Sequence, residues 1–193
     1  KNCVVVNRSS SASTNAAINI SNYNASSVNY NPDNLTIDNC TLTSVTGTAS
    51  AGFHVANSGT PTVGMTALTV RGNAIAGNLR GIFVSYTYDA NMYDNTITVA
   101  ATGATTNITS YGITVQTNFA TTGVFNIYNN KLTSLTTNCT TAGASNGIMG
   151  IDNQNTTAHT VNIYNNFIGG FGLTGAANNA RIYGIRTTST STT

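Results

Sequence analysis

The sequence of 193 residues has very few charged side chains: seven Lys or Arg and five acids, all of which are Asp. A soluble domain ordinarily has about a quarter charged residues. Here 29 Asn, 35 Thr and 16 Ser supply the polar surface instead. The seven cations are scattered and form no basic stripe that could bind phosphates, so we expect no nucleic-acid partner.

Long apolar runs and paired cysteines are also missing. Runs such as Val4-Val5-Val6 are far shorter than the roughly 20 residues that span a bilayer, so we expect no membrane-spanning segment. Cys3, Cys40 and Cys139 form no Cys-x-x-Cys pair and have no His at metal spacing, which predicts no metal and no cofactor. One disulfide stays open, but spacing does not assign it. Since 40% of the chain is apolar and its net charge is only +2, we expect it to fold.

The chain does contain an internal repeat, which decides the fold class. The first motif has the form Ile-Tyr-Asn-Asn-x-Ile and recurs at residues 37–42, 70–75, 92–97, 127–132 and 163–168, with a truncated copy at 1–4. The second motif is a small residue followed by apolar-x-apolar, at residues 17–20, 52–55, 81–84, 112–115, 147–151 and 184–186. The two motifs alternate strictly, and neighbouring copies of the second motif lie 29 to 37 residues apart.

This pattern predicts an all-β parallel solenoid. No segment has a sustained 3.6-residue apolar period, and Thr, Val, Ile and Tyr favour strands, so we expect no significant helix. Alternation predicts two inner stacks that run from coil to coil. One contains Ile37, Val70, Met92, Ile127 and Ile163, and the other contains Leu42, Ile75, Ile97, Leu132 and Ile168. We expect one domain over residues 1–193, with about five to six coils of three short strands each.

Between the two inner stacks, one position is nearly always Asn. Asn tolerates the left-handed backbone of a sharp turn, and amides stacked every ~4.8 Å can bond to one another. The sequence therefore predicts an asparagine ladder that is interrupted at Cys40. Its members are Asn2, Asn73, Asn95, Asn130 and Asn166.

These units resemble the repeats of right-handed parallel β-helix proteins, the fold of pectate-lyase-like enzymes, tailspikes and many bacterial surface proteins. The Asn/Thr-rich composition is similar to that of secreted β-helix surface proteins of Bacteroidota-like bacteria. The resemblance implies an extracellular or cell-surface location. It also implies that any catalytic site lies on the outward positions of the second motif, which we assign to Asn19, His54, Phe83, Thr114, Met149 and Arg186.

Enzymatic activity is not expected at those positions. Lyases of this fold hold Ca²⁺ with clustered acids, and the related hydrolases need a pair of carboxylic acids. The outward positions that we assign contain no carboxylate. The five acids are scattered, and we interpret Asp94 as a turn residue. They are Asp33, Asp38, Asp89, Asp94 and Asp152.

One outward column has a distinct composition. Asp38 and Arg71 should be neighbours in consecutive coils and form an ion pair, and the column continues as Tyr93, Tyr128 and Tyr164. The three tyrosines are either a glycan-binding strip, because aromatic faces accept sugars, or a structural ladder of stacked rings.

The remaining candidates are weaker. We interpret His54 and His159 as isolated surface residues. Rows of Thr are similar to those of ice-binding solenoids but are interrupted, for example at Ala74 and Lys131. Glycosylation motifs of the form Asn-x-Ser/Thr occur at Asn7, Asn19, Asn24, Asn34, Asn39, Asn107, Asn138 and Asn155.

Both ends of the predicted solenoid are open, and an uncovered coil is a template for another. We therefore expect the chain to belong to a longer solenoid or to stack end to end, as a structural extracellular rod, filament subunit or stalk. The alternative is an adhesin or carbohydrate-binding module that uses the tyrosines or the loops at 136–146 and 173–181. A polysaccharide lyase or hydrolase is the least favoured function.

Overall fold

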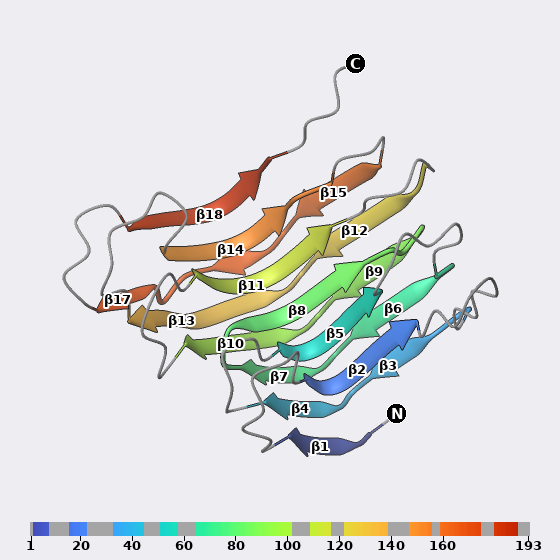
Figure 1. Cartoon of the computed structure of the whole chain (residues 1–193), viewed down its shortest axis with the longest axis horizontal. Helices are drawn as coiled ribbons and strands as arrows, with labels where there is room; N and C mark the ends of the chain where they lie inside the picture. The colour runs from blue at the N-terminus through green and yellow to red at the C-terminus, as the bar shows by residue number, and fades with distance from the viewer. Residues whose placement is uncertain are drawn as a thin grey trace.

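A computed structural model of the chain describes residues 2–7, 16–22, 33–44, 51–57, 65–101, 109–116, 122–138, 147–155, 159–174 and 180–188. Every regular element in these ranges is a β-strand. No helix in the described ranges is long and apolar enough to cross a membrane. The strands form three parallel sheets, and successive turns of the chain add strands to them in the same order, except that the last described turn adds none to the third sheet (Figure 1).

Sheet A receives the strand that follows each Asn turn, and its rungs follow the order β1-β4-β7-β10-β13-β16, with β17 also paired to β13. Its strands are β1 (Val4–Asn7), β4 (Thr41–Ser44), β7 (Ala74–Gly77), β10 (Thr96–Ala101), β13 (Lys131–Asn138), β16 (Phe167–Ile168) and β17 (Gly172–Thr174).

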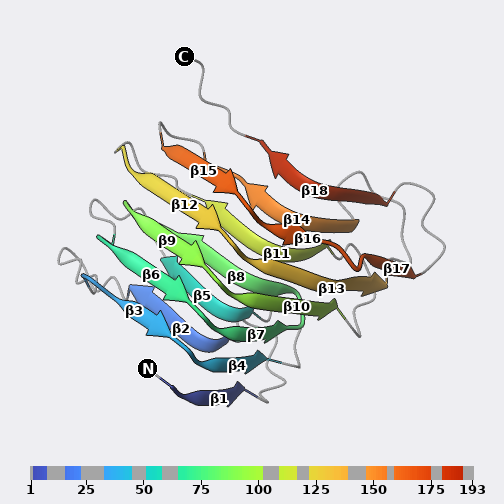
Figure 2. The ribbon, with the colours of Figure 1, turned by 180° about the vertical axis from the view of Figure 1, so that it is seen from behind.

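Sheet B contains the second motif, in the order β18-β14-β11-β8-β5-β2. Its strands are β2 (Ala16–Asn22), β5 (Ala51–Asn57), β8 (Arg80–Ser85), β11 (Thr109–Gln116), β14 (Gly147–Asn153) and β18 (Arg181–Thr187). Seen from behind, sheets A and C lie in front of sheet B (Figure 2).

Sheet C contains the first half of the first motif, in the order β15-β12-β9-β6-β3. Its strands are β3 (Thr36–Asp38), β6 (Leu68–Arg71), β9 (Ala90–Tyr93), β12 (Val124–Tyr128) and β15 (Thr160–Tyr164). The fold is therefore an all-β parallel β-helix, as the repeat predicts.

The predicted inner stacks are confirmed by the strand register. In sheet C, Ile37 pairs with Val70, Val70 with Met92, Met92 with Ile127 and Ile127 with Ile163. In sheet A, Leu42, Ile75, Ile97, Leu132 and Ile168 pair in the same manner. Most of these side chains are fully buried, and they belong to one continuous core.

The turn between sheets C and A corrects one assignment. The residue with a left-handed backbone precedes the ladder position, and this column contains Asn2, Asn39, Gly72, Asp94, Asn129 and Asn165. Asn2 is therefore a turn residue, and Cys3 occupies its predicted place in the ladder, because Val4 pairs with Thr41. The predicted alignment of the truncated first copy is therefore wrong by one residue, because Cys3, not Asn2, corresponds to Cys40. Asp94 is a turn residue, as predicted.

Candidate functional site

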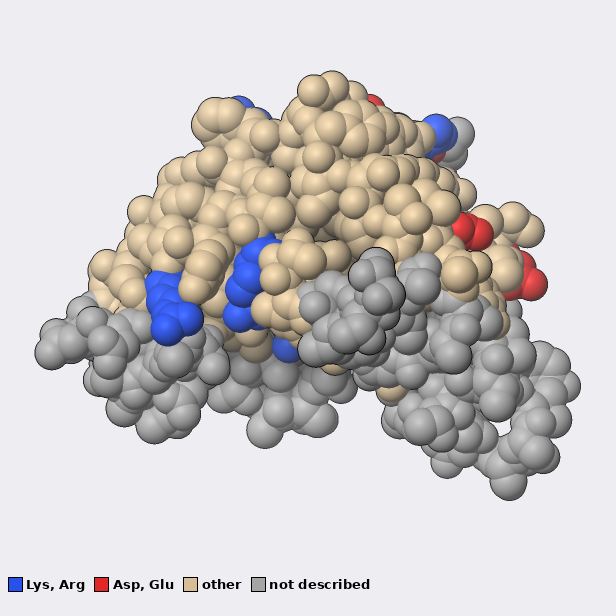
Figure 3. Space-filling model, turned by 90° about the horizontal axis from the view of Figure 1, so that it is seen from above, with Lys and Arg blue, Asp and Glu red and all other residues tan. Residues whose placement is uncertain are grey.

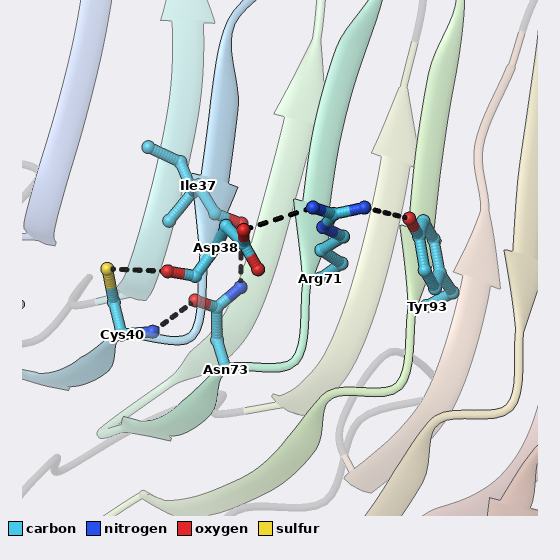
Figure 4. A network of polar contacts seen from close by, with 6 residues as sticks. All are labelled: Ile37, Asp38, Cys40, Arg71, Asn73 and Tyr93. Atoms are coloured by element: carbon cyan, nitrogen blue, oxygen red, sulfur yellow. Dashed lines mark hydrogen bonds and ion pairs between the residues drawn. The ribbon is translucent and has the colours of Figure 1, made fainter. Parts of the chain in front are cut away.

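The outer column of sheet C is the most distinctive surface. Its register pairs Asp38 with Arg71 and Arg71 with Tyr93, and then Tyr93, Tyr128 and Tyr164 follow one another. Arg71 Nη2 donates to Asp38 Oδ2 at 3.1 Å, which confirms the predicted ion pair, and Arg71 Nη1 donates to the Tyr93 hydroxyl at 3.0 Å (Figure 4). Arg71 thus links the acidic and aromatic parts of the column.

The tyrosine rings stack on one another. The ring centroids of Tyr93 and Tyr128 are 4.8 Å apart with an interplanar angle of 6°, and those of Tyr128 and Tyr164 are 5.0 Å apart at 2°. The facing sides of neighbouring rings therefore cover each other, and the rings present their edges and hydroxyl groups outward. A sugar cannot lie flat on these facing sides, so the geometry favours a structural ladder. Tyr164, which is 47% exposed, ends the stack.

A hollow of about 260 Å³ lies beside the charged end of this column. It is lined by Asp38, Asn39, Arg71, Gly72, Tyr93 and Asp94. Gly72 takes the turn position with φ +63°, where other rungs place an Asn or Asp side chain. The hollow presents amide, carboxylate and guanidinium groups beside an aromatic ring.

Electrostatics in the column follow from these contacts. The hydrogen bond to Asp38 is the main cause that raises the pKa of Arg71, followed by the bond to Tyr93. Partial burial, with Tyr93 and Tyr164 on either side, raises the pKa of Tyr128 above its usual value. Arg71 is thus held cationic and Tyr128 neutral at ordinary pH, so neither acts as a proton carrier there.

The buried asparagine ladder lies at the inner corner. Asn73 Nδ2 donates to Asn95 Oδ1 at 3.0 Å, Asn95 to Asn130 at 2.9 Å and Asn130 to Asn166 at 3.0 Å. Each Oδ1 also accepts the backbone N–H of the preceding rung, and each Nδ2 also donates to a backbone carbonyl there. All four hydrogen-bonding capacities of an inner amide such as that of Asn95 are used. These residues are therefore structural.

A second asparagine ladder was missed in the sequence. On the outer face of sheet C, Asn126 Nδ2 donates to Asn91 Oδ1 and Asn162 Nδ2 donates to Asn126 Oδ1, both at 2.9 Å. Each Asn directly precedes an inner-stack residue, namely Met92, Ile127 or Ile163. That regular spacing is the signal that could have revealed the ladder.

The outward column of sheet B also needs a correction. Thr114 pairs with Asp152 and Asp152 with Arg186, so Asp152, not Met149, occupies this column. The motif glycine of this rung is Gly150 rather than Gly147. A Cβ added to Gly150 would meet the backbone of Gly184, just as one added to Gly112 would meet the backbone of Gly150. A carboxylate is therefore present among the outward positions, contrary to the sequence assignment.

The Asp152 carboxylate is already engaged. It is 0% exposed, accepts Arg186 Nε at 2.7 Å and Nη2 at 2.6 Å, and is also contacted by Gln154 Nε2. The bond to Asp152 is the main cause that raises the pKa of Arg186. A second arginine, Arg80, lies 4.4 Å from the ring centroid of Phe83. A carboxylate in a bidentate ion pair is poorly placed for general acid or base chemistry.

The predicted glycosylation motifs differ in accessibility. Asn19, Asn34, Asn39 and Asn138 are exposed, whereas Asn155 is 2% exposed and its N–H donates to Asn153 Oδ1. A glycan cannot be attached to Asn155 in this fold. Asn7 lies in β1, but its side chain lies outside the described part of the structure, as do residues Asn24 and Asn107.

Other sequence candidates fall at separate places. His159 stacks on Phe125 with centroids 5.3 Å apart, so it is not an isolated surface residue, and the side chain of His54 lies outside the described part. The Thr rows form the outer face of sheet A, where Thr and Ala alternate around a hollow of about 160 Å³. Most of the predicted binding loops, at 139–146 and 175–179, lies outside the described residues.

Among the described residues, no cluster of three or more His, Cys, Asp or Glu could hold a metal ion. No protein-family model, curated protein or solved structure matches the chain. The likeness to pectate-lyase-like and bacterial surface proteins thus rests on the repeat motifs, and the fold established here is the parallel β-helix itself.

Proposed function

We propose that the chain is a structural β-solenoid that serves as an extracellular rod, filament subunit or cell-surface stalk and lengthens by stacking coils end to end. The observation that carries this proposal is the repetition of the same contacts along the axis. From Asn73 to Asn166 each rung offers the next one the same amide at the corner, and along the stack the rungs share two apolar inner positions and parallel strand bonds. A unit built in this way can be extended without a new kind of interface.

The last described rung supports this proposal. Val70, Met92 and Ile127 within the stack are fully buried, whereas Ile182 and Ile185 in β18 are 48% and 51% exposed. Another rung, from this chain or from a second copy, would cover them. Seen from the end at which β18 lies, most of the described surface is uncharged (Figure 3). Little electrostatic repulsion therefore opposes stacking.

A glycine column provides a selective test. A Cβ at Gly112 would lie 2.5 Å from the carbonyl oxygen of Gly150, and one at Gly150 would lie 2.4 Å from that of Gly184. A Cβ at Gly184 meets no atom within 4 Å. Ala17 stands opposite Gly52 in the same column and β2 still pairs with β5, so a single Cβ is tolerated there and a larger side chain is needed to block it. Gly184→Val should leave the isolated chain stable and prevent the close approach of a further rung.

The decisive experiment is electron microscopy of the purified chain at near-neutral pH, in which we expect fibres with a ~4.8 Å axial repeat. Gly184→Val should abolish the fibres at an unchanged melting temperature. Thr41→Val, on the exposed side of sheet A, is the matched control and should keep them. Dispersed monomers of the unmodified chain, or fibres that survive Gly184→Val, would contradict self-stacking.

A second candidate function is glycan binding by an adhesin-like module, which the hollow beside Tyr93 favours. Carboxylate, amide and guanidinium groups next to an aromatic edge suit sugar hydroxyls. Asp94→Asn is the sharpest test, because Asn occupies the same turn position in four other rungs and should preserve the backbone. Glycan-array binding that is lost in Asp94→Asn would support this function, and unchanged binding would exclude the hollow.

Catalysis is the least favoured function. Asp152, the carboxylate in the sheet B column, is bonded to Arg186 and Gln154. Depolymerisation of an acidic or neutral polysaccharide by the chain would overturn this view.

A further inference from the structure

The corner column changes chemistry in its first two rungs. Hydrogen bonds between side-chain amides join Asn73, Asn95 and the asparagines after them, but the two preceding positions of the column are Cys3 and Cys40. The N–H of Thr41 donates to the carbonyl of Cys3 at 2.8 Å, and Val4 pairs with Thr41. Cys3 therefore lies directly beside Cys40 on the adjacent parallel strand, and both are free thiols.

We propose that Cys3 and Cys40 form a redox-active pair that closes into a disulfide between the first two rungs. Neighbouring strands lie about 4.7–4.9 Å apart. This spacing is within the 4.4–6.8 Å between Cα atoms that disulfides span. Because the two residues are in register, their side chains leave the strands in the same direction. Closure requires only a small approach of the two sulfur atoms and no change of pairing.

The surroundings leave the thiols available to each other. Asn73 Oδ1 accepts a hydrogen bond from the backbone N–H of Cys40 at 2.8 Å, and this bond does not involve the sulfur of Cys40 (Figure 4). The Cys40 thiol donates a weak hydrogen bond to the carbonyl oxygen of Asp38 at 3.4 Å, which it gives up when the disulfide forms. Cys40 is 3% exposed, whereas Cys3 is partly accessible, so an external oxidant meets Cys3 first. The side-chain hydrogen bond with Cys40 is the main cause that raises the pKa of the Cys3 thiol, so the exchange at Cys3 should become faster as the pH rises above neutral.

The oxidant is a low-molecular-weight disulfide, and the exchange is balanced. The Cys3 thiolate attacks one sulfur of the oxidant and releases the first thiolate, which leaves a mixed disulfide on Cys3. Cys40 loses its proton and attacks the Cys3 sulfur, which releases the second thiolate. The two protons from Cys3 and Cys40 go to the two released thiolates, and the two electrons reduce the oxidant.

The consequence is a covalent bond between the two rungs that have Cys at the corner and therefore form no Asn–Asn hydrogen bond with each other. The later rungs are joined at the corner by Asn–Asn hydrogen bonds, so β1 should open more readily than they do. A disulfide that joins residues distant in sequence restricts such opening. The pair therefore acts as a redox-dependent clamp on β1.

The test uses the full chain, purified reduced and then equilibrated with glutathione disulfide. Non-reducing peptide mapping should find the peptide with Cys3 linked to that with Cys40 in monomeric protein, and a mass loss of about 2 Da. Hydrogen exchange of β1 amides should be at least about tenfold slower in the oxidised form, while β10 and β12 stay unchanged. Cys3→Ser should abolish both effects, and Cys139→Ser should abolish neither.

Three results would overturn the proposal: a link from Cys139 to either residue, a link between two copies, or persistent free thiols at Cys3 and Cys40. Circular dichroism of each variant separates these outcomes from misfolding. Cys3→Ser is preferred to a change at Cys40 because Cys3 is less buried. If oxidised and reduced chains exchange β1 amides equally fast, the bond does not clamp the rung.

Discussion

The two asparagine ladders have nearly the same bond lengths and differ in burial. The inner amides of Asn95 and Asn130 are 1% exposed, and their bonds to the next rung are 2.9–3.0 Å long. The outer bonds, from Asn126 to Asn91 and from Asn162 to Asn126, are 2.9 Å long at the surface. The inner amides donate toward the following rung, and the outer ones toward the preceding rung.

The comparison shows that geometry alone does not set the value of a hydrogen bond. An outer amide that loses its neighbour can bond to water at little cost. An inner amide cannot, because each atom that loses its partner stays buried. The inner ladder is therefore the element that fixes the turn between sheets C and A, and the outer ladder adds only a small stabilisation.

The largest expected effect comes from breaking the inner ladder. Asn95→Ala removes the partners of Asn73, Asn130 and the Val70 carbonyl, and we expect a loss of about 4 kcal/mol in unfolding free energy. Asn126→Ala should cost less than about 1 kcal/mol. Chemical denaturation of both variants measures the difference, and equal losses would show that burial is not decisive.

The two ion pairs allow the same comparison with charges. Both carboxylates are buried, with the Asp152 side chain 0% and the Asp38 side chain 4% exposed, but Arg186 is 23% exposed and Arg71 is 41% exposed. Arg186→Met should cost about 3 kcal/mol, because it leaves a buried carboxylate without its cation. Arg71→Met should cost less, because water reaches the Arg71 pair more easily and screens it. Thermal unfolding of the two variants in low and high salt provides the check, and the Arg71 pair should respond more strongly to salt.

The repeat made most of the fold predictable, because each strand copy repeats one pattern of apolar and polar residues. Errors arose where a copy offered two similar residues. Asn2-Cys3 matches Asn39-Cys40, yet Asn2 was aligned with the second Asn of the later copies. In β14 both Gly147 and Gly150 fit the small-residue position. Asn153 stands where other copies have Val, so the correct alignment at Gly150 does not match the motif. Single-residue register is weakly marked in such copies.

The candidate site was less predictable than the fold. The sequence placed Asp38, Arg71 and the tyrosines in one column, and the structure agrees. Ring orientation could not be read from spacing, since it depends on side-chain torsions. The hollow could not be predicted either, because its shape depends on how the side chains of neighbouring rungs pack around Gly72.

Gly72 provides a prediction of intermediate size. Its φ is +63°, and a Cβ there would lie 2.5 Å from Asn39 Oδ1, so Gly72→Ala should cost about 1–2 kcal/mol. Asp94→Asn in the same turn column should change stability by less than about 0.5 kcal/mol. Urea unfolding of both variants provides the measurement. If Gly72→Ala left the free energy of unfolding unchanged, the turn would accommodate the added methyl group without strain.

The smallest expected effect is a dependence on pH through His159. Burial lowers the pKa of this ring, which packs on Phe125, and nearby Asp89 opposes that shift only in part. The unfolded chain therefore binds a proton at a higher pH than the folded chain, and stability falls as pH decreases through the ordinary His pKa of about 6.5. The ring is only partly buried, so the loss between pH 7.5 and 5 should stay below about 1 kcal/mol. Unfolding curves of the unmodified chain and of His159→Phe should diverge over that interval, and parallel curves would assign any pH dependence to another group.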